Sequence, residues 1–519
     1  MASTFFGLTI AYSGLQAANT SLTITGHNVS NINTNGYTKQ QAGTQAADAL
    51  RTHTTYGAIG SGVVVTEISQ IRDSYYDVKY RNNMANYGQY SVKESYMGQI
   101  EDYLDEFTLN GYSQEYKNFF SAVNQLTITP GDTSAKNQLI NNAKSLADYF
   151  NTLTTNLRNV QADANNEIKD AVQQINSYAK NIAALNRQIN QIEANYGNAN
   201  DLRDKRNAMI DELSEIVNLE TSEEDMGNNV SNFSVRINGQ TLVSSYSYNT
   251  LETVARTDKK NYSDAEGLYD VQWNSGQKFD MYSTSLSGHL KGLIDIRDGN
   301  NGEHENIETD DDGNNVTDSD GNLVLTTAPA ADKTVSFKGV PYYQAQLNEF
   351  ARIFSDAVNK IMKSGYTSDG SSKGISLFVT QPNTTVMSAG NITVNPELLK
   401  NADLLAIKKG QNDGESDARI MEELNKLQSE KIFAGGTGSY FLESIVSDMS
   451  IDSQKAVNLY KNYTDLKTSI HNQRLSIMGV DTDEEAMDMI KYQQAYNLNS
   501  KMMSVMNQIY DKLINQTGI

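Results

Sequence analysis

Residues that could carry out chemistry are few in this chain, and their spacing does not suit a catalytic or metal site. No two of the five histidines have the spacing of a zinc site, and the run that begins at His304 lacks the second histidine of a metalloprotease helix. Cysteine is absent, which excludes disulfides, thiolate metal sites and thiol nucleophiles. The glycine-rich stretch 57–62 precedes a strand-like run, whereas a phosphate-binding loop needs a helix N-terminus. We therefore expect no catalytic residues, no cofactor and no enzymatic activity.

The acidic run 310–322 is the one serious candidate for a metal site. Its sequence, DDDGNNVTDSDGN, holds two Asp-x-Asp-Gly units that begin at Asp310 and Asp318. Calcium-binding loops use this spacing because alternate oxygen ligands converge where a glycine permits the turn. No glutamate occupies the bidentate position after either glycine. We therefore interpret the run as a solvated surface loop, with a weak Ca²⁺ site as the alternative.

Composition and charge limit the classes of partner. The chain has 519 residues, of which 38% are hydrophobic, so several domains with real cores can form. Its formal net charge of −21 argues against nucleic acid or an anionic membrane as partner, because both attract clustered Lys and Arg. No apolar run is long enough for a transmembrane helix, and the N-terminal residues lack the positive charge of a cleavable signal peptide. These features predict a cytoplasmic protein or one exported without a Sec signal.

Both ends of the chain carry amphipathic helical patterns. Near the N-terminus, apolar residues recur every seven positions, at Leu8, Leu15, Leu22 and Val29. Near the C-terminus, one helical face carries the apolar residues Met503, Met506, Tyr510 and Leu513. A helix with a seam that repeats every seven residues requires a partner helix. We predict that the two ends pair as a coiled coil and leave further surface for neighbouring subunits.

Between the ends, helical and strand-like patterns alternate in blocks. Neither Gly nor Pro occurs in 135–192, where an apolar heptad with one four-residue slip predicts a long helix. Shorter helices are predicted over 201–217 and 342–362. The region 232–335 is typical of short strands and includes a hairpin with an Asn-Gly turn. This order predicts a mainly α fold with an inserted β domain, that is, a multidomain α+β protein.

Two blocks at opposite ends of the chain resemble sequences of a known family. The block Asn28 to Tyr37, NVSNINTNGY, is similar to the N-terminal signature of the axial proteins of the bacterial flagellum, which are the rod, hook and hook-associated proteins. Asn35 stands where the family usually has proline, and Gly36 occupies a position where a positive φ is expected. The C-terminal block 479–496, GVDTDEEAMDMIKYQQAY, is most similar to the hook-associated proteins. The same holds for two internal blocks, 200–206 and 292–299.

The resemblance implies a structural subunit that the flagellar type III apparatus exports and that forms a ring of identical copies between hook and filament, outside the cell. The implied partners are other copies of the chain, the hook subunit, the second junction protein with the filament, and an export chaperone that binds the C-terminal helix. Nucleic acid and membrane are not among them. The alternatives are another axial subunit, from the hook or distal rod, and an adhesin or enzyme with its function in the outer insert.

We expect three layers in such a subunit. They are a terminal α-helical coiled coil of 1–45 plus 468–519, a long-helix bundle as the middle domain of 46–221 plus 336–467, and a β-rich outer domain of 222–335. Contacts between subunits are predicted at the chain ends, at Leu8, Leu15, Leu22, Asn28, Val29, Asn31, Ile32, Asn33, Gly36, Tyr37, Met489, Ile490, Gln493, Tyr496, Met503, Met506, Tyr510 and Leu513.

Overall fold

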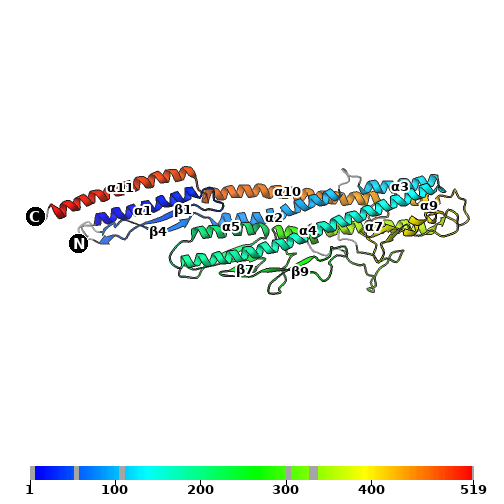
Figure 1. Cartoon of the computed structure of the whole chain (residues 1–519), viewed down its shortest axis with the longest axis horizontal. Helices are drawn as coiled ribbons and strands as arrows, with labels where there is room; N and C mark the ends of the chain where they lie inside the picture. Colours follow the sequence, from blue (N-terminus) through cyan, green and yellow to red (C-terminus); the bar gives the residue numbers. More distant parts are fainter. Residues whose placement is uncertain (1–5, 52–57, 105–110, 300–304, 327–336, 517–519) are drawn as a thin grey trace. The chain divides into compact units, whose positions relative to one another are not determined.

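The computed structural model describes residues 6–51, 58–104, 111–299, 305–326 and 337–516. The fold is mainly helical with several small antiparallel sheets, as the sequence predicts (Figure 1). Contacts divide the chain into two compact units. Unit 1 comprises 1–85, 175–250 and 463–519, and unit 2 comprises 86–174 and 251–462.

Three of the four boundaries between the units fall within long helices, and the fourth lies at 250/251. The long helices are α2 (Ser74–Leu104), α4 (Thr133–Glu193) and α10 (Gly438–Met478). The long helix predicted over 135–192 is confirmed, because α4 runs for 61 residues. The three-layer division stays a prediction. The strands that the sequence assigned to one outer domain are shared between the two units, with β5–β8 in unit 1 and β9–β10 in unit 2.

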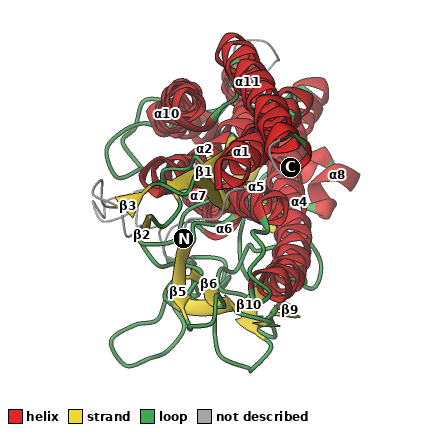
Figure 2. Ribbon diagram, turned by 90° about the vertical axis from the view of Figure 1, so that its left-hand side faces the viewer, coloured by secondary structure: helices red, strands yellow, loops and turns green. Residues whose placement is uncertain are grey.

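In unit 1, α1 (Phe6–Ser30) lies between α11 (Thr482–Asn515) and a two-stranded sheet (Figures 1 and 2). The sheet pairs β1 (Gln40–Ala46) with β4 (Val63–Gln70) in antiparallel register, and the short strands β2 (Leu50–Arg51) and β3 (Ala58–Ile59) form a second pair. The chain ends therefore pair as helices, and a β ribbon supports one of them.

The rest of unit 1 contains α5 (Asn200–Ile216) and a four-stranded sheet. The strands are β5 (Glu220–Asp225), β6 (Ser231–Ile237), β7 (Gln240–Ser244) and β8 (Ser247–Tyr248). Asn238 and Gly239 both have positive φ, at 49° and 76°, as a two-residue turn of type I′ requires. The predicted Asn-Gly hairpin is therefore confirmed.

Aromatic side chains form the centre of unit 2. Phe350 of α7 (Gly339–Ser364) stacks on Phe433, with 5.1 Å between the ring centroids. Further rings come from α3 (Tyr112–Ile128), from β12 and from the start of α10, and they are Phe119, Phe120, Phe378 and Phe441. Such offset aromatic contacts stabilise a core beyond the area they bury. The helix predicted over 342–362 is thus confirmed as α7, and it contributes Phe350 and Phe354 to the core.

The smaller elements of unit 2 surround this aromatic core. Three antiparallel strand pairs are present: β9 (Leu251–Ala255) with β10 (Tyr269–Trp273), β11 (Tyr366–Thr367) with β14 (Ala406–Lys408), and β12 (Phe378–Thr380) with β13 (Ile392–Val394). The remaining helices are α6 (His289–Asp298), α8 (Pro396–Lys400), the 3-10 helix Ala402–Leu404 and α9 (Arg419–Lys426).

The acidic run predicted as a surface loop folds into two similar turns. The carboxylate of Asp310 accepts hydrogen bonds from the backbone N–H groups of Asp312 and Asn314, and Asp318 accepts them from Asp320 and Asn322 in the same way. The two carboxylates thus accept hydrogen bonds from backbone N–H groups of their own turns. Within the described residues, no group of three or more His, Cys, Asp or Glu is placed to hold a metal ion.

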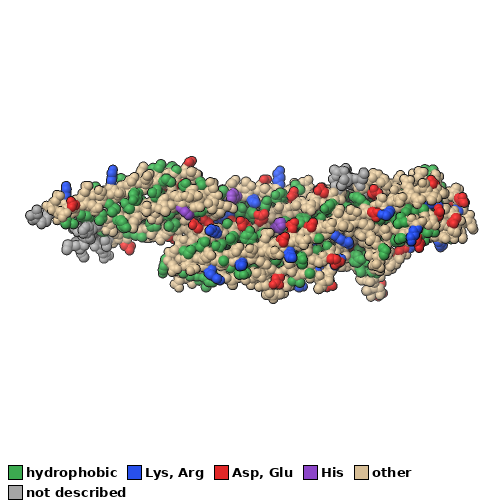
Figure 3. All heavy atoms as spheres, in the orientation of Figure 1, with side chains coloured by type: hydrophobic (Ala, Val, Ile, Leu, Met, Phe, Trp, Pro, Cys, Tyr) green, Lys and Arg blue, Asp and Glu red, His purple; other side chains and the backbone are tan. Residues whose placement is uncertain are grey.

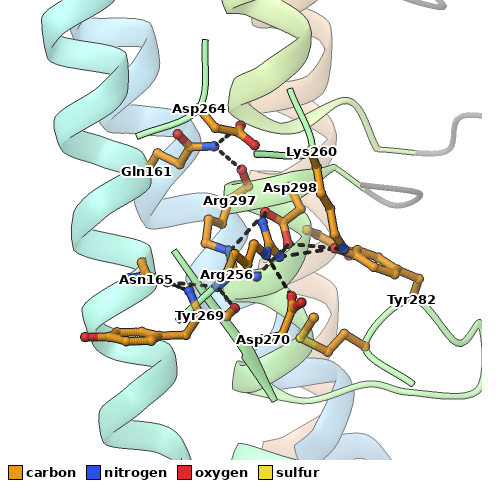
Figure 4. A network of polar contacts seen from close by, with 12 residues as sticks. Gln161, Asn165, Arg256, Lys260, Asp264, Tyr269, Asp270, Tyr282, Arg297 and Asp298 are labelled. Atoms are coloured by element: carbon orange, nitrogen blue, oxygen red, sulfur yellow. Dashed lines mark hydrogen bonds and ion pairs between the residues drawn. The ribbon is translucent and has the colours of Figure 1, made fainter. Parts of the chain in front are cut away.

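A buried charge network joins α6 to β9 and β10 (Figure 4). Asp298 is buried and accepts hydrogen bonds from Arg256 (2.6 and 3.0 Å), from Arg297 (2.6 and 3.0 Å) and from the Tyr282 hydroxyl (2.8 Å). Burial opposes ionisation of Asp298, but the two guanidinium groups hold its pKa below the usual range. The network connects to α4 through Asn165, whose Oδ1 accepts a hydrogen bond from Arg297 at 2.9 Å.

We predict that Asp298→Asn lowers the free energy of unfolding by roughly 3–5 kcal/mol at neutral pH, because it leaves two buried guanidinium groups without their shared carboxylate. The folded pKa lies below the unfolded one, so the ionised group stabilises the fold above the unfolded value of about 4. The difference between parent and variant should shrink as pH falls below that value. Denaturant unfolding at several pH values measures both effects.

Asp270→Asn is the matched control. Asp270 also binds Arg256, at 2.7 Å, but its side chain is half exposed. An exposed ion pair contributes up to about 1 kcal/mol. An equal loss of stability in both variants would contradict the role assigned to Asp298.

Candidate assembly site at the paired chain ends

Small residues bring α1 and α11 together. A Cβ atom on Gly7 would lie 2.9 Å from Met506, and one on Gly14 would lie 2.8 Å from Asn499, so both glycines contact α11 directly. The residues that continue the heptad of these glycines toward Asn28 are all buried, and they are Ala11, Ala18, Ser21 and Thr25. Small side chains at such positions let two helix backbones approach closely. This small-residue seam is the surface that pairs the chain ends.

The apolar seam predicted from the sequence lies elsewhere. Leu8, Leu15, Leu22 and Val29 are each one position beyond the small-residue seam, and each is only partly buried. One residue turns an α-helix by about 100°, so these side chains lie on the flank of the contact with α11. These side chains are thus only partly covered within one chain, and Leu15 lines a groove together with Met503 of α11. Their predicted contacts with other subunits stay a prediction. The helices pair through Gly, Ala, Ser and Thr, and the larger residues remain accessible.

One side of α11 faces α1 and is half buried. Of the residues predicted as contacts, Tyr496, Met503, Met506 and Tyr510 lie on this side. A neighbouring stripe of large apolar side chains is exposed. Of the predicted contact residues, Leu513 belongs to this stripe and is 51% exposed. Ile490 (57% exposed), Met489 and Gln493 are exposed as well, but at about 100° per residue Met489 and Gln493 lie on another side of the helix from Leu498.

Sequence analysis missed several members of the exposed stripe. Leu498, Met502, Val505 and Ile509 carry exposed apolar side chains, and Leu498 is 68% exposed. Their spacing of three or four residues is the signal by which the sequence indicates this second face. Hydrophobic side chains cover much of the visible surface of α1 and α11 (Figure 3). An open groove of about 760 Å³ between the two helices is lined by Leu15 and Met503.

The signature block 28–37 has a different role, because several of its side chains bond within unit 1. Asn28 is 2% exposed. Its amide nitrogen donates to the Gln40 carbonyl at 3.0 Å and to Glu485 Oε2 at 3.2 Å. Its amide oxygen accepts from the Tyr37 hydroxyl at 2.8 Å and from the Gln40 N–H at 3.1 Å. Asn28 thus joins the end of α1 to β1 and to the start of α11.

Lys39 fixes the junction of α10 and α11. Its ammonium group lies 2.8 Å from Glu484 and 3.0 Å from Glu485, and its backbone N–H donates to the Met478 carbonyl at 2.9 Å. Burial lowers the pKa of Lys39, but hydrogen bonds to the two carboxylates outweigh this and raise it. Asp481 caps α11 by accepting from the N–H of Glu484 at 3.1 Å. Lys39 was not among the residues predicted from the sequence.

The loop after the signature block is tied to α5. The N–H and hydroxyl of Thr38 donate to Asp204 at 3.0 and 2.7 Å. Burial raises the pKa of Asp204, although these hydrogen bonds and Arg72 oppose that shift. Gly36 has φ of 79°, which confirms the predicted left-handed conformation, and a Cβ there would lie 3.1 Å from Ala208. Asp204, in the block 200–206 that resembles hook-associated proteins, therefore binds the residue that directly follows the signature block.

The structure divides the predicted contact residues into two groups. Asn28 and Tyr37 bond to neighbours in their own chain, and Asn31 donates to the His27 carbonyl at 3.0 Å. Ile32 and Asn33 are exposed and, with Gly36 and Tyr37, line a cavity of about 610 Å³ closed by α2, α5 and α10. The residues of the terminal helices form the second, outward group.

The sequence of this chain is similar to those of flagellar proteins. Residues 97–378, more than half of the chain, match the family model described as the flagellar hook-associated protein FlgK helical domain. The chain belongs to this family. Residues 471–516 match the model described as the flagellar basal body rod FlgEFG protein C-terminal. The FlgK family consists of structural proteins of the flagellum, and the chain is one of these hook-associated proteins.

Relatives match over nearly the whole length. Flagellar hook-associated protein 1 of Bacillus subtilis is 27% identical over 100% of this chain and 99% of its own. The protein of that name from Salmonella typhimurium is 28% identical over 97% of this chain and 98% of its own. In fold, the chain resembles the flagellar hook junction protein FlgK from Burkholderia pseudomallei, with a TM-score of 0.60 over 77% of this chain and 100% of that chain at 15% identity. The hook or distal rod alternative is therefore not favoured. No described helix is long and apolar enough to cross a membrane.

We predict that Lys39→Met accelerates hydrogen exchange of backbone amides in the first turns of α11, because Glu484 and the buried Glu485 lose their cation. Since the folded pKa of Lys39 lies above its ordinary value of about 10.4, its contribution is complete below that pH and disappears as pH rises through the folded value. Lys491→Met is the matched control, because Lys491 forms an exposed pair with Asp488 at 3.5 Å. Equal acceleration in both variants would rule out a special role for Lys39.

Proposed function

We propose that copies of this chain assemble at the junction between the hook and the filament of the bacterial flagellum, as a ring that the filament needs for its assembly. The observation that supports this best is the exposed apolar stripe on α11 beside the partly exposed leucine seam on α1. Within one chain, α1 and α11 pair through the small-residue seam. The larger apolar residues are therefore available to other subunits.

Energetics favour a protein partner for these faces. Complete burial of a Leu or Ile side chain contributes about 1.5–3 kcal/mol, and the stripe repeats along most of α11. A contiguous exposed apolar surface of this kind marks a site of protein association. Helical neighbours suit it, because the apolar residues follow the spacing of a helix that packs against helices. Identical copies in a ring would each present the same two faces.

The outward group of predicted contact residues is the part we assign to subunit contacts. It comprises Leu8, Leu15, Leu22, Val29, Met489, Ile490, Gln493 and Leu513. The half-buried residues of α11 and the inward residues of the signature block act indirectly, because they hold these faces in place. In this proposal the terminal domain predicted from the sequence, 1–45 plus 468–519, makes the contacts of the assembly.

Further partners follow from position in such an assembly. The hook subunit would contact the ring on one side, and the second junction protein with the filament on the other. Before assembly, the apolar face of α11 needs cover, and an export chaperone that binds this helix would supply it. We assign the export of the chain to the flagellar type III apparatus because the chain belongs to a family of flagellar hook-associated proteins.

Leu498→Asp tests the exposed face directly. We expect cells that carry it to release filament subunits into the medium and to lack filaments, because a charge buried at a subunit contact costs several kcal/mol. The thermal unfolding of the isolated chain should hardly change, since Leu498 is exposed there. Electron microscopy of the cells and immunoblots of the medium give the result. Leu15→Asp should behave in the same way.

The matched control is Leu399→Asp in α8, where an exposed leucine of unit 2 receives the same charge. Cells with this variant should form normal filaments. Normal filaments on Leu498→Asp cells would show that the exposed face of α11 makes no essential contact in the junction.

A further inference from the structure

A polar cavity in unit 2 has the features of a ligand site, and it does not enter the proposed assembly function. Its volume is about 460 Å³, and it is partly enclosed. Five segments contribute described residues to its lining: α2, the loop before α6, α6 itself, Phe337 just before α7, and α10. We propose that this cavity binds a small organic oxyanion, with its carboxylate or phosphate group held by the lysines of the cavity and its hydroxylated body held by the surrounding polar side chains.

Charge supports an anionic ligand. Lys93 and Lys291 are both buried, and both bind Asp295, at 2.6 and 2.9 Å. One carboxylate thus serves two buried cations. The cavity is also lined by Lys455 and by Asp452, which accepts a hydrogen bond from the Tyr343 hydroxyl at 3.1 Å. Its described lining therefore holds three lysines and two aspartates, in a chain whose net charge is −21.

The residues around the cavity do not offset the excess of lysines over aspartates in its lining. Lys338 pairs with Asp448 at 2.9 Å on the neighbouring helices, so this pair adds no net charge. Burial is the main cause that lowers the pKa of Lys93, and the nearby Lys291 and Lys455 lower it further although Asp295 opposes them. An anion in the cavity would offset this repulsion. Buried cations without a full set of counter-charges are costly, so a bound anion stabilises them.

Neutral donors complete the arrangement. The loop before α6 contributes Thr284, Ser285 and Ser287 to the lining. The helix that follows is capped by Gly288, which provides no side-chain cap hydrogen bond. A helix N-terminus carries partial positive charge and favours anions. The loop that leads into α6 thus brings hydroxyl groups to the same cavity as the lysines.

The size of the cavity indicates more than an inorganic ion. A volume of about 460 Å³ lies in the range of pockets for small organic molecules. Beyond the lysines, the lining holds the amides of Asn86 and Gln89 and the rings of Tyr90 and Tyr282. Amides bind hydroxyl groups, and aromatic rings pack against the apolar faces of a sugar-like body. The charged group itself is either a carboxylate or a phosphate, and both fit the lysines.

Isothermal titration calorimetry of the full-length chain tests this in buffer free of phosphate and citrate. The probes are glucuronate, glucose 6-phosphate and glucose, which share a ring and differ in charged group. We expect at least one charged sugar to bind and glucose not to bind. The tighter of the two charged sugars identifies the group as carboxylate or phosphate. Absence of binding by both, or equal binding by glucose, would overturn the proposal.

Two variants locate the binding. Lys455→Gln should raise the Kd of the charged sugar by about tenfold, the effect of losing one charge-assisted hydrogen bond. Lys455 is exposed on α10, so its removal should leave the melting temperature unchanged. Lys461→Gln removes the same charge from an exposed position of α10 that does not line the cavity, and it should leave the Kd unchanged. An equal effect of both variants would mean that the anion interacts only with the general charge of the surface, and the site would be refuted.

Discussion

The close approach of α1 to α11 is the constraint on which the rest of unit 1 depends. A Cβ atom at Gly7 or Gly14 would lie within 3 Å of the side chain of Met506 or Asn499, so a larger residue at either position would displace that side chain. Because the two helices pair through small residues, the leucines of α1 and the apolar stripe of α11 are not consumed by the fold. A single chain can therefore be folded at its ends and still expose apolar surface along both terminal helices.

Polar contacts give this pairing its register. A seam of Gly, Ala, Ser and Thr is nearly uniform along its length, so it does not by itself define how far one helix is shifted along the other. Asn28 and Lys39 supply that definition, because both bond to Glu485 at the start of α11. Their partners are buried, and a shifted register would leave charged or amide groups without hydrogen bonds. The family signature is therefore a structural element that positions α11 against α1.

Unit 2 relies on the same principle with a different core. Stacked phenylalanines supply the apolar contacts, and buried guanidinium–carboxylate networks fix the loops around α6. Asp298 is shared by two arginines, and Asp295 is shared by two lysines. The first group is closed by hydrogen bonds from all sides, whereas the second borders a cavity. This difference separates a purely structural network from the candidate ligand site.

Much of the architecture could be predicted from the sequence because it depends on local periodicity. The absence of Gly and Pro in 135–192 specified the long helix α4, and the Asn-Gly pair specified the turn between β6 and β7. Gly36 was recognisable because few other residues adopt a positive φ. The family, too, could be inferred from two short blocks at the chain ends.

The tertiary structure alone decided which face of each terminal helix packs within the chain and which face remains exposed. Periodicity identifies an apolar seam, but it cannot tell whether that seam is buried by the same chain or exposed to another. Leu15 and Leu22 follow a perfect heptad, yet Gly14 and Ser21, one position earlier, lie in the contact with α11. Lys39 and Glu485 are separated by most of the chain, so nothing local indicates that they form an ion pair. The sequence determined which helices form, and packing between distant segments determined which of their surfaces remain available for assembly.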